Sequence, residues 1–164
     1  PTVAAVIPFG GHDEAEMLRL AACLEEHYPH SMANAVVAEA KRHGLTHEEY
    51  HSQVQYVVAH GISSVVEGKK VIIGSAHFVF EDEGCRIPEG EQPKFDALPA
   101  AYSQLYLCID GELAAVICIH DPLRREAREA VKALHESGFT NVVMMTGDNR
   151  RTAESVAAAF FLSL

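Results

Sequence analysis

A short polar turn near the end of the chain, Thr146-Gly147-Asp148, has the residue types that can hold a phosphate group. It follows the apolar run NVVMM (141–145) and precedes a stretch with helical character. Glycine lets the backbone turn tightly, threonine offers a hydroxyl, and the start of the next helix offers N–H groups to an anion. Asp148 could also help to hold a magnesium shell. A plain helix N-cap at Asp148 or Asn149 explains the same residues, so the turn alone decides nothing.

Asp121 is predicted to lie at the same sheet edge as this turn. It follows the apolar run AAVICI (114–119), and an amphipathic helix over 121–138 leads from there to NVVMM. Strand, helix and strand in this order predict a right-handed βαβ unit with a parallel pair, in which 141–145 is a buried strand. Ligands of such sheets bind at the carboxyl ends of the strands.

A competing motif is HExxH, formed by His47, Glu48 and His51. On a helix, the two imidazoles would lie on one face and could bind zinc, with Glu48 as a base. However, the sequence near Gly44 does not favour a long helix, and Thr46 with Glu49 fits a capping box better. No third ligand follows at a suitable spacing, so we predict no metal ligands and keep a zinc hydrolase as a minor hypothesis.

The residues His30, Gly61 and Gly74 carry weaker signals. His30 stands at the start of a small-residue helix, and the two glycines stand at strand ends, where a ligand can approach the backbone closely. A packing histidine and ordinary turn glycines explain the same pattern. From the residues alone, the structural explanation (a packing histidine and turn glycines) is preferred to ligand binding.

The elements that position these residues form two parts. Residues 1–115 are predicted to form an antiparallel sheet flanked by helices. The pattern predicts a strand over 3–8, three β-rich runs within 53–80, and a loop with one helical turn over 81–99. It also predicts a helix over 12–29, capped by His12 or Asp13, and a helix over 31–44, capped by Ser31. Two hairpins turn at 67–70 and at Asp110-Gly111. Residues 116–164 predict a partial parallel α/β part, so the fold class is α/β (α+β).

Charge and composition narrow the possible partners. The formal net charge of −10 argues against nucleic acid or an anionic membrane surface. The four cysteines form no CxxC pair, which indicates reduced, buried thiols in a cytosolic protein. No apolar run is long enough to span a bilayer, and we expect the chain to be a piece of a longer protein that is not itself inserted in a membrane.

Five motifs in register resemble one family. The motifs TGDN, DPLR, AHGI and VIIGS, together with the histidine at a helix start, resemble the cytosolic ATP-binding unit of heavy-metal-transporting P-type ATPases over essentially the whole chain. That family carries a nucleotide-binding domain inserted into a phosphorylation domain of the haloacid-dehalogenase type. The resemblance implies a nucleotide-binding domain over 1–115 and part of a phosphorylation domain over 116–164.

The resemblance also assigns site residues. His30 matches the histidine of the adenine-binding His-Pro pair, with Ser31 in place of the proline, and Glu25 matches the nearby acidic residue. Gly61 and Ile62 match the glycine turn in which Ala59 replaces the first glycine, and Gly74-Ser75 match a Gly-Asn pair. Thr146, Gly147 and Asp148 match the residues near the γ-phosphate, and Asp121 matches the acidic residue of DPxR.

The implied activity belongs to the whole parent protein. ATP with Mg²⁺ would phosphorylate an aspartate, and this step would drive a metal cation across a membrane. Partners would be ATP and the remaining phosphorylation, actuator and transmembrane domains, with this part on the cytoplasmic side. The phosphorylated aspartate of DKTGT is absent from these 164 residues, so we expect this part alone to be inactive. A soluble haloacid-dehalogenase-type phosphatase with a large cap is the alternative.

Overall fold

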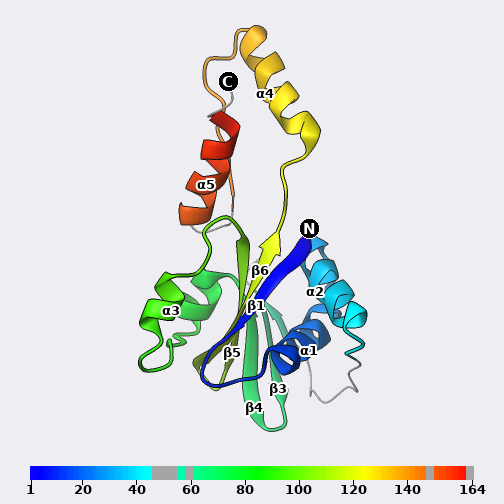
Figure 1. Ribbon diagram of the computed structural model, residues 1–164, viewed down its shortest axis with the longest axis vertical. Coiled ribbons are helices and arrows are strands. Elements are labelled where there is room, and N and C mark those ends of the chain that lie inside the picture. Colours follow the sequence, from blue (N-terminus) through cyan, green and yellow to red (C-terminus); the bar gives the residue numbers. More distant parts are fainter. Residues whose placement is uncertain (46–54, 58–60, 147–149, 162–164) are drawn as a thin grey trace.

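A six-stranded antiparallel sheet forms the centre of the molecule (Figure 1). The computed structural model describes residues 1–45, 55–57, 61–146 and 150–161. The strands lie in the order β1-β6-β5-β4-β3-β2, so the first and last strands of the described ranges are neighbours. Their bounds are Thr2–Pro8 (β1), Gln55–Val57 (β2), Gly61–Val66 (β3), Lys69–Gly74 (β4), Ser103–Ile109 (β5) and Glu112–His120 (β6). The predicted antiparallel sheet is therefore confirmed.

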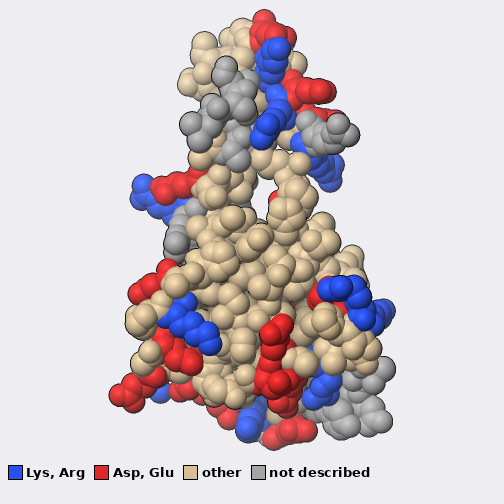
Figure 2. All heavy atoms as spheres, viewed as in Figure 1, with Lys and Arg blue, Asp and Glu red and all other residues tan. Residues whose placement is uncertain are grey.

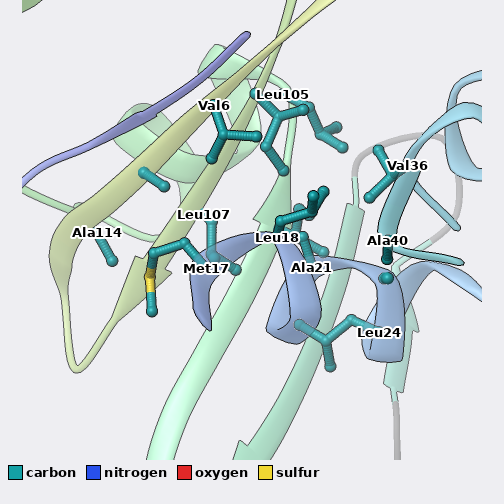
Figure 3. Close-up of a cluster of buried hydrophobic side chains, with 14 of the residues drawn as sticks. Val6, Met17, Leu18, Ala21, Leu24, Val36, Ala40, Leu105, Leu107 and Ala114 are labelled. Carbon is teal, nitrogen blue, oxygen red and sulfur yellow. The ribbon is translucent and has the colours of Figure 1, made fainter. Parts of the chain in front are cut away.

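Two helices, α1 (Glu14–Glu25) and α2 (Ser31–Arg42), cover one face of this sheet. Figure 3 shows side chains of α1, such as Leu18 and Leu24, packed among those of α2 and of the strands. Leu24, Val36 and Leu107 are fully buried in this cluster. Burying one such side chain contributes about 1.5–3 kcal/mol, so the apolar periodicity of α1 and α2 is what attaches them to the sheet.

One of the two predicted N-cap residues is confirmed by the structure, and the other is wrong. Asp13 caps α1, because its Oδ2 accepts a hydrogen bond from the Glu16 N–H at 3.0 Å. For α2 the predicted cap Ser31 is wrong, since Ser31 is already the first helical residue. The cap is His30, whose backbone is extended and whose Nδ1 accepts from the Ala33 N–H at 3.3 Å.

Both predicted hairpins are formed around two residues with positive φ. Glu67 and Gly68 have φ of 50° and 79°, and Asp110 and Gly111 have φ of 49° and 80°. Two consecutive left-handed residues match the right-handed twist of the flanking strands, which is why Gly follows an acidic residue in each turn. The second turn is also joined to β4, since Asp110 Oδ1 accepts from the Lys70 N–H at 2.8 Å.

We expect Asp110→Ala to lower the free energy of unfolding by about 1 kcal/mol, because the Lys70 N–H loses its acceptor and alanine tolerates a positive φ poorly. Asp110→Asn is the matched control, since asparagine keeps a side-chain acceptor and adopts the left-handed region readily. Urea unfolding of the three proteins measures the difference. Equal stability of the Ala and Asn variants would show that this bond contributes nothing.

The opposite face of the sheet carries shorter elements. The end of the β-rich stretch is not strand: β4 stops at Gly74, and a π-helix, η1, runs over His77–Asp82. The single helical turn expected in 81–99 is α3, Gln92–Asp96. Phe80 meets the rings of Phe95 and Tyr106 edge to face, at centroid distances of 5.5 and 5.3 Å. This aromatic packing gives η1 and α3 a second buried cluster of their own.

Helices α4 (Arg125–Glu136) and α5 (Arg150–Phe161) extend away from the sheet (Figure 1). Figure 2 shows an opening between the segments that join this region to the sheet body. The predicted buried strand at 141–145 is not formed, and Val143 and Met145 are 82% and 94% exposed. β6 already pairs with β1 and β5, so it offers no free edge to a parallel neighbour. The expected parallel pair is therefore absent from the described residues.

The predicted division at residue 116 falls inside β6. This strand pairs with β1 and β5 on both sides of Val116, and Val116 is fully buried. The chain leaves the sheet only after His120. No helix in the described part of the chain combines the length and apolar character that a membrane span requires.

Candidate nucleotide-binding site

Glu25 and His30 are brought together where α1 ends and α2 begins. Glu25 is the last residue of α1, and His30 caps α2 after the short connection through Pro29. The His30 Nε2 lies 3.2 Å from Glu25 Oε2. The two side chains differ in exposure: that of Glu25 is 3% exposed and that of His30 is 48% exposed. A buried carboxyl therefore lies beneath a ring that solvent or a ligand can reach.

Both groups favour their uncharged forms. Burial raises the pKa of Glu25 to about 7, and burial also lowers the pKa of His30. Since His30 Nδ1 accepts from Ala33, the network assigns the ring proton to Nε2, which faces Glu25. Glu25 Oε2 is 3.2 Å from this ring nitrogen but has no hydrogen-bond partner within the described part of the molecule. A buried polar atom without a partner is costly, and a ligand that hydrogen-bonds to it would remove that cost.

Gly61 and Gly74 lie directly opposite each other in the β3–β4 pair. A Cβ at Gly61 would come within 2.5 Å of both the Ile73 carbonyl oxygen and the Phe78 ring. Gly61 does not have a positive φ, so close packing of η1 on β3 requires glycine here, rather than a turn. Phe78 had no signal in the sequence, because its contact with Gly61 depends on η1 folding back over the strands.

Ile62 and Ser75 flank this glycine pair and have structural contacts. Ile62 is 2% exposed and shares its buried cluster with Leu24, the neighbour of Glu25. β3 and α1 are in contact. The Ser75 Oγ accepts from the Phe78 N–H at 3.3 Å, which supports the first turn of η1.

The second group of predicted residues is only partly described. Asp121 is exposed and lines a cavity of about 530 Å³ together with Arg124 and Arg128. Ser155 and Val156 of α5 line the same cavity, so α5 lies next to the DPLR segment. The two arginines are four residues apart across the start of α4, a spacing that could have pointed to a shared helix face.

Thr146 is exposed. Gly147 and Asp148 lie outside the described residues, as does the HExxH motif at 47–51. The described residues contain no group of three or more His, Cys, Asp or Glu side chains that could hold a metal ion. Within the described lining of the 530 Å³ cavity, Asp121 is the single carboxylate, so these residues alone do not complete a magnesium site.

Comparison with known proteins decides the family. Residues 1–163 match the family of haloacid dehalogenase-like hydrolases. The chain belongs to this family. Within it, the chain is 33% identical over 165 aligned positions to the copper-exporting P-type ATPase of Bacillus subtilis (strain 168), an alignment that covers 96% of this chain and 19% of the relative. The chain thus spans about a fifth of the length of the curated relatives that it matches.

Solved structures show the same family relationship. A zinc-transporting PIB-type ATPase in an E2·Pi state matches 97% of this chain and 25% of its own, with a TM-score of 0.63 and 28% identity. The N-domain of HMA8, a copper-transporting P-type ATPase, matches 73% of this chain and 100% of its own, with a TM-score of 0.62 and 25% identity. The predicted resemblance of this haloacid dehalogenase-like chain to heavy-metal-transporting P-type ATPases is therefore confirmed.

Proposed function

We propose that this chain is the ATP-binding part of a heavy-metal-translocating P-type ATPase, and that Glu25 and His30 hold the adenine. The observation that carries the proposal is the pairing of a buried carboxyl lacking a hydrogen bond with a half-exposed neutral ring. Adenine is uncharged and flat, with hydrogen-bonding nitrogen atoms at its edge. A neutral imidazole can stack on such a base, and a carboxyl group beneath it can exchange a hydrogen bond with the edge.

We assign the remaining predicted residues to other parts of the ATP molecule. Gly61 and Gly74 are opposite each other at one end of the β3–β4 pair, Phe78 packs against Gly61, and Ile62 lies in the core next to them. In the proposed arrangement, the triphosphate of ATP extends toward Thr146, Gly147 and Asp148. Because the chain has a net charge of −10, local groups must hold the phosphates, and the backbone N–H groups of the TGD turn and the side chains of Arg124 and Arg128 have the required character.

The wider parts of the proposal concern the parent protein. Residues 1–115 would form the nucleotide-binding domain and residues 116–164 part of the phosphorylation domain. The chain leaves the sheet after His120, where β6 ends. The other domains of the parent would be partners, and this part would lie on the cytoplasmic side of the membrane. Mg²⁺ commonly binds through one or two carboxylates plus substrate phosphates, which fits Asp121 and Asp148 as contributors when ATP is bound.

Phosphoryl transfer itself needs an aspartate that these 164 residues do not include in a DKTGT motif. The role of this chain in that reaction would be to position ATP and stabilise its charge. No feature of the described residues favours a soluble phosphatase, and the relatives compared above are P-type ATPases.

We expect the chain to bind Mg·ATP in calorimetric titration but to form no acid-stable phosphoprotein when incubated with γ-labelled ATP. A protein that contains the whole parent sequence serves as the positive control for labelling. Strong labelling of the 164-residue chain would contradict the proposal that the phosphorylated aspartate lies elsewhere in the parent protein. Absence of any ATP binding would contradict the proposed function itself.

A further inference from the structure

Cys85 and Cys108 are brought side by side by pairing between distant segments. The residue after Cys85, Arg86, donates its N–H to the Gly111 carbonyl at 2.9 Å and accepts from the Leu113 N–H at 2.8 Å. Leu113 is the register partner of Cys108 in the β5–β6 pair. Arg86 thus extends the edge of β6 that faces away from β5, and Cys85 meets Cys108 within the second buried cluster, where the two thiols interact through a side-chain hydrogen bond.

This pair lies in the second buried cluster, on the sheet face opposite to the Glu25 side. Cys85 is 7% exposed and Cys108 is 1% exposed, and Phe78, Val79 and Leu98 belong to the same cluster. Burial raises the pKa of both thiols, so both carry protons at neutral pH. The ammonium group of Lys70 pairs with Glu83, and both act on Cys85: Lys70 lowers and Glu83 raises its pKa.

We propose that Cys85 and Cys108 form a binding site for one soft monovalent metal cation of the Cu(I) or Ag(I) type, held between the two sulfur atoms. Thiolates are the ligands that select soft metals. When the ion enters, two S–H bonds break, two S–metal bonds form and two protons leave to solvent. No atom is oxidised or reduced. The site then carries one negative charge.

The ligand set favours this ion over zinc. Structural zinc requires four ligands in a tetrahedron, and no group of three or more candidate ligands occurs in the described ranges. Two-sulfur coordination satisfies a soft monovalent ion, because such ions accept two thiolate ligands in a line.

Silver ion is the probe, added to the 164-residue chain under a phosphine reductant with excess free methionine. Native mass spectrometry should show one retained silver ion per chain, and a weakly buffered solution should register two protons released per ion. Cys85→Ala and Cys108→Ala should each lose the retained ion. Cys118→Ala is the matched control, since Cys118 is buried in the same cluster but is not part of the proposed pair, and it should keep the ion.

The proposal is overturned if the wild-type chain retains no ion, releases one proton per ion, or keeps the ion in the Cys85→Ala variant. It is also overturned if Cys118→Ala loses the ion as completely as Cys108→Ala. Circular dichroism of each variant shows whether it is folded, and the proton count on the wild-type chain tests the site without any variant. ATP affinity should not change on silver binding, because the proposed adenine position lies on the other sheet face, so this test is separate from that of the proposed function.

Discussion

His30→Ala should weaken ATP binding about tenfold or more, measured by calorimetric titration. Stacking of a base on a ring contributes about 1–3 kcal/mol, and 1.4 kcal/mol corresponds to a factor of ten in affinity. The side chain is about half exposed and lies over the buried Glu25, so it can meet a ligand without a change of fold. The variant should also lose some stability, because His30 Nδ1 is the N-cap of α2 and loss of a cap costs about 0.5–2 kcal/mol.

His30→Asn separates these two effects. Asparagine is a good N-cap residue, so this variant should keep the stability of α2 while losing the ring that stacks on adenine. It should therefore bind ATP as weakly as His30→Ala but melt close to wild type. His27→Ala, an exposed histidine on the same connection, is the matched control and should bind ATP normally. Normal ATP affinity in a folded His30→Asn variant would remove the adenine assignment.

Glu25→Gln should make the fold more stable than wild type at pH 8 by about 3 kcal/mol. Burial raises the pKa of Glu25 from 4.5 to about 7, and each pKa unit corresponds to about 1.4 kcal/mol. Between these two pH values the folded chain binds more protons than the unfolded chain, so stability falls as pH rises. The wild-type contribution is fully present below pH 4.5 and is lost as pH rises through 7. Glutamine carries no charge and avoids this loss.

Urea unfolding at a series of pH values from 5 to 8 measures the effect. The difference in unfolding free energy between Glu25→Gln and wild type should grow with pH. The lowered pKa of His30 has the opposite effect on stability, but His30 is present in both proteins, so its effect cancels in the comparison. Glu26→Gln, at the next and exposed position, is the control for a general charge effect. Parallel curves for wild type and Glu25→Gln would show that the Glu25 carboxyl does not titrate in the folded protein near pH 7.

Much of the local structure was predictable, because its signals lie within a few residues. The α1 cap at Asp13 and the two hairpin turns depend on side chains and φ values inside one turn of chain. The α2 cap was predicted one residue late, since Ser31 is the usual residue type and histidine is an unusual acceptor. The Glu25–His30 pair was named from a family resemblance, and its site residues stay predictions until ligand binding is measured.

The amino-acid sequence by itself determined the antiparallel strands, the helices and their turns, since apolar periodicity and turn residues act locally. Only the tertiary structure decided that β1 lies beside β6, that Phe78 packs on Gly61, and that Glu25 is buried without a hydrogen bond. It also decided that the apolar run at 141–145 is exposed rather than a strand. The reason is physical: strand partners and burial are set by which distant segments compete for each sheet edge and face, and that competition has no local signature.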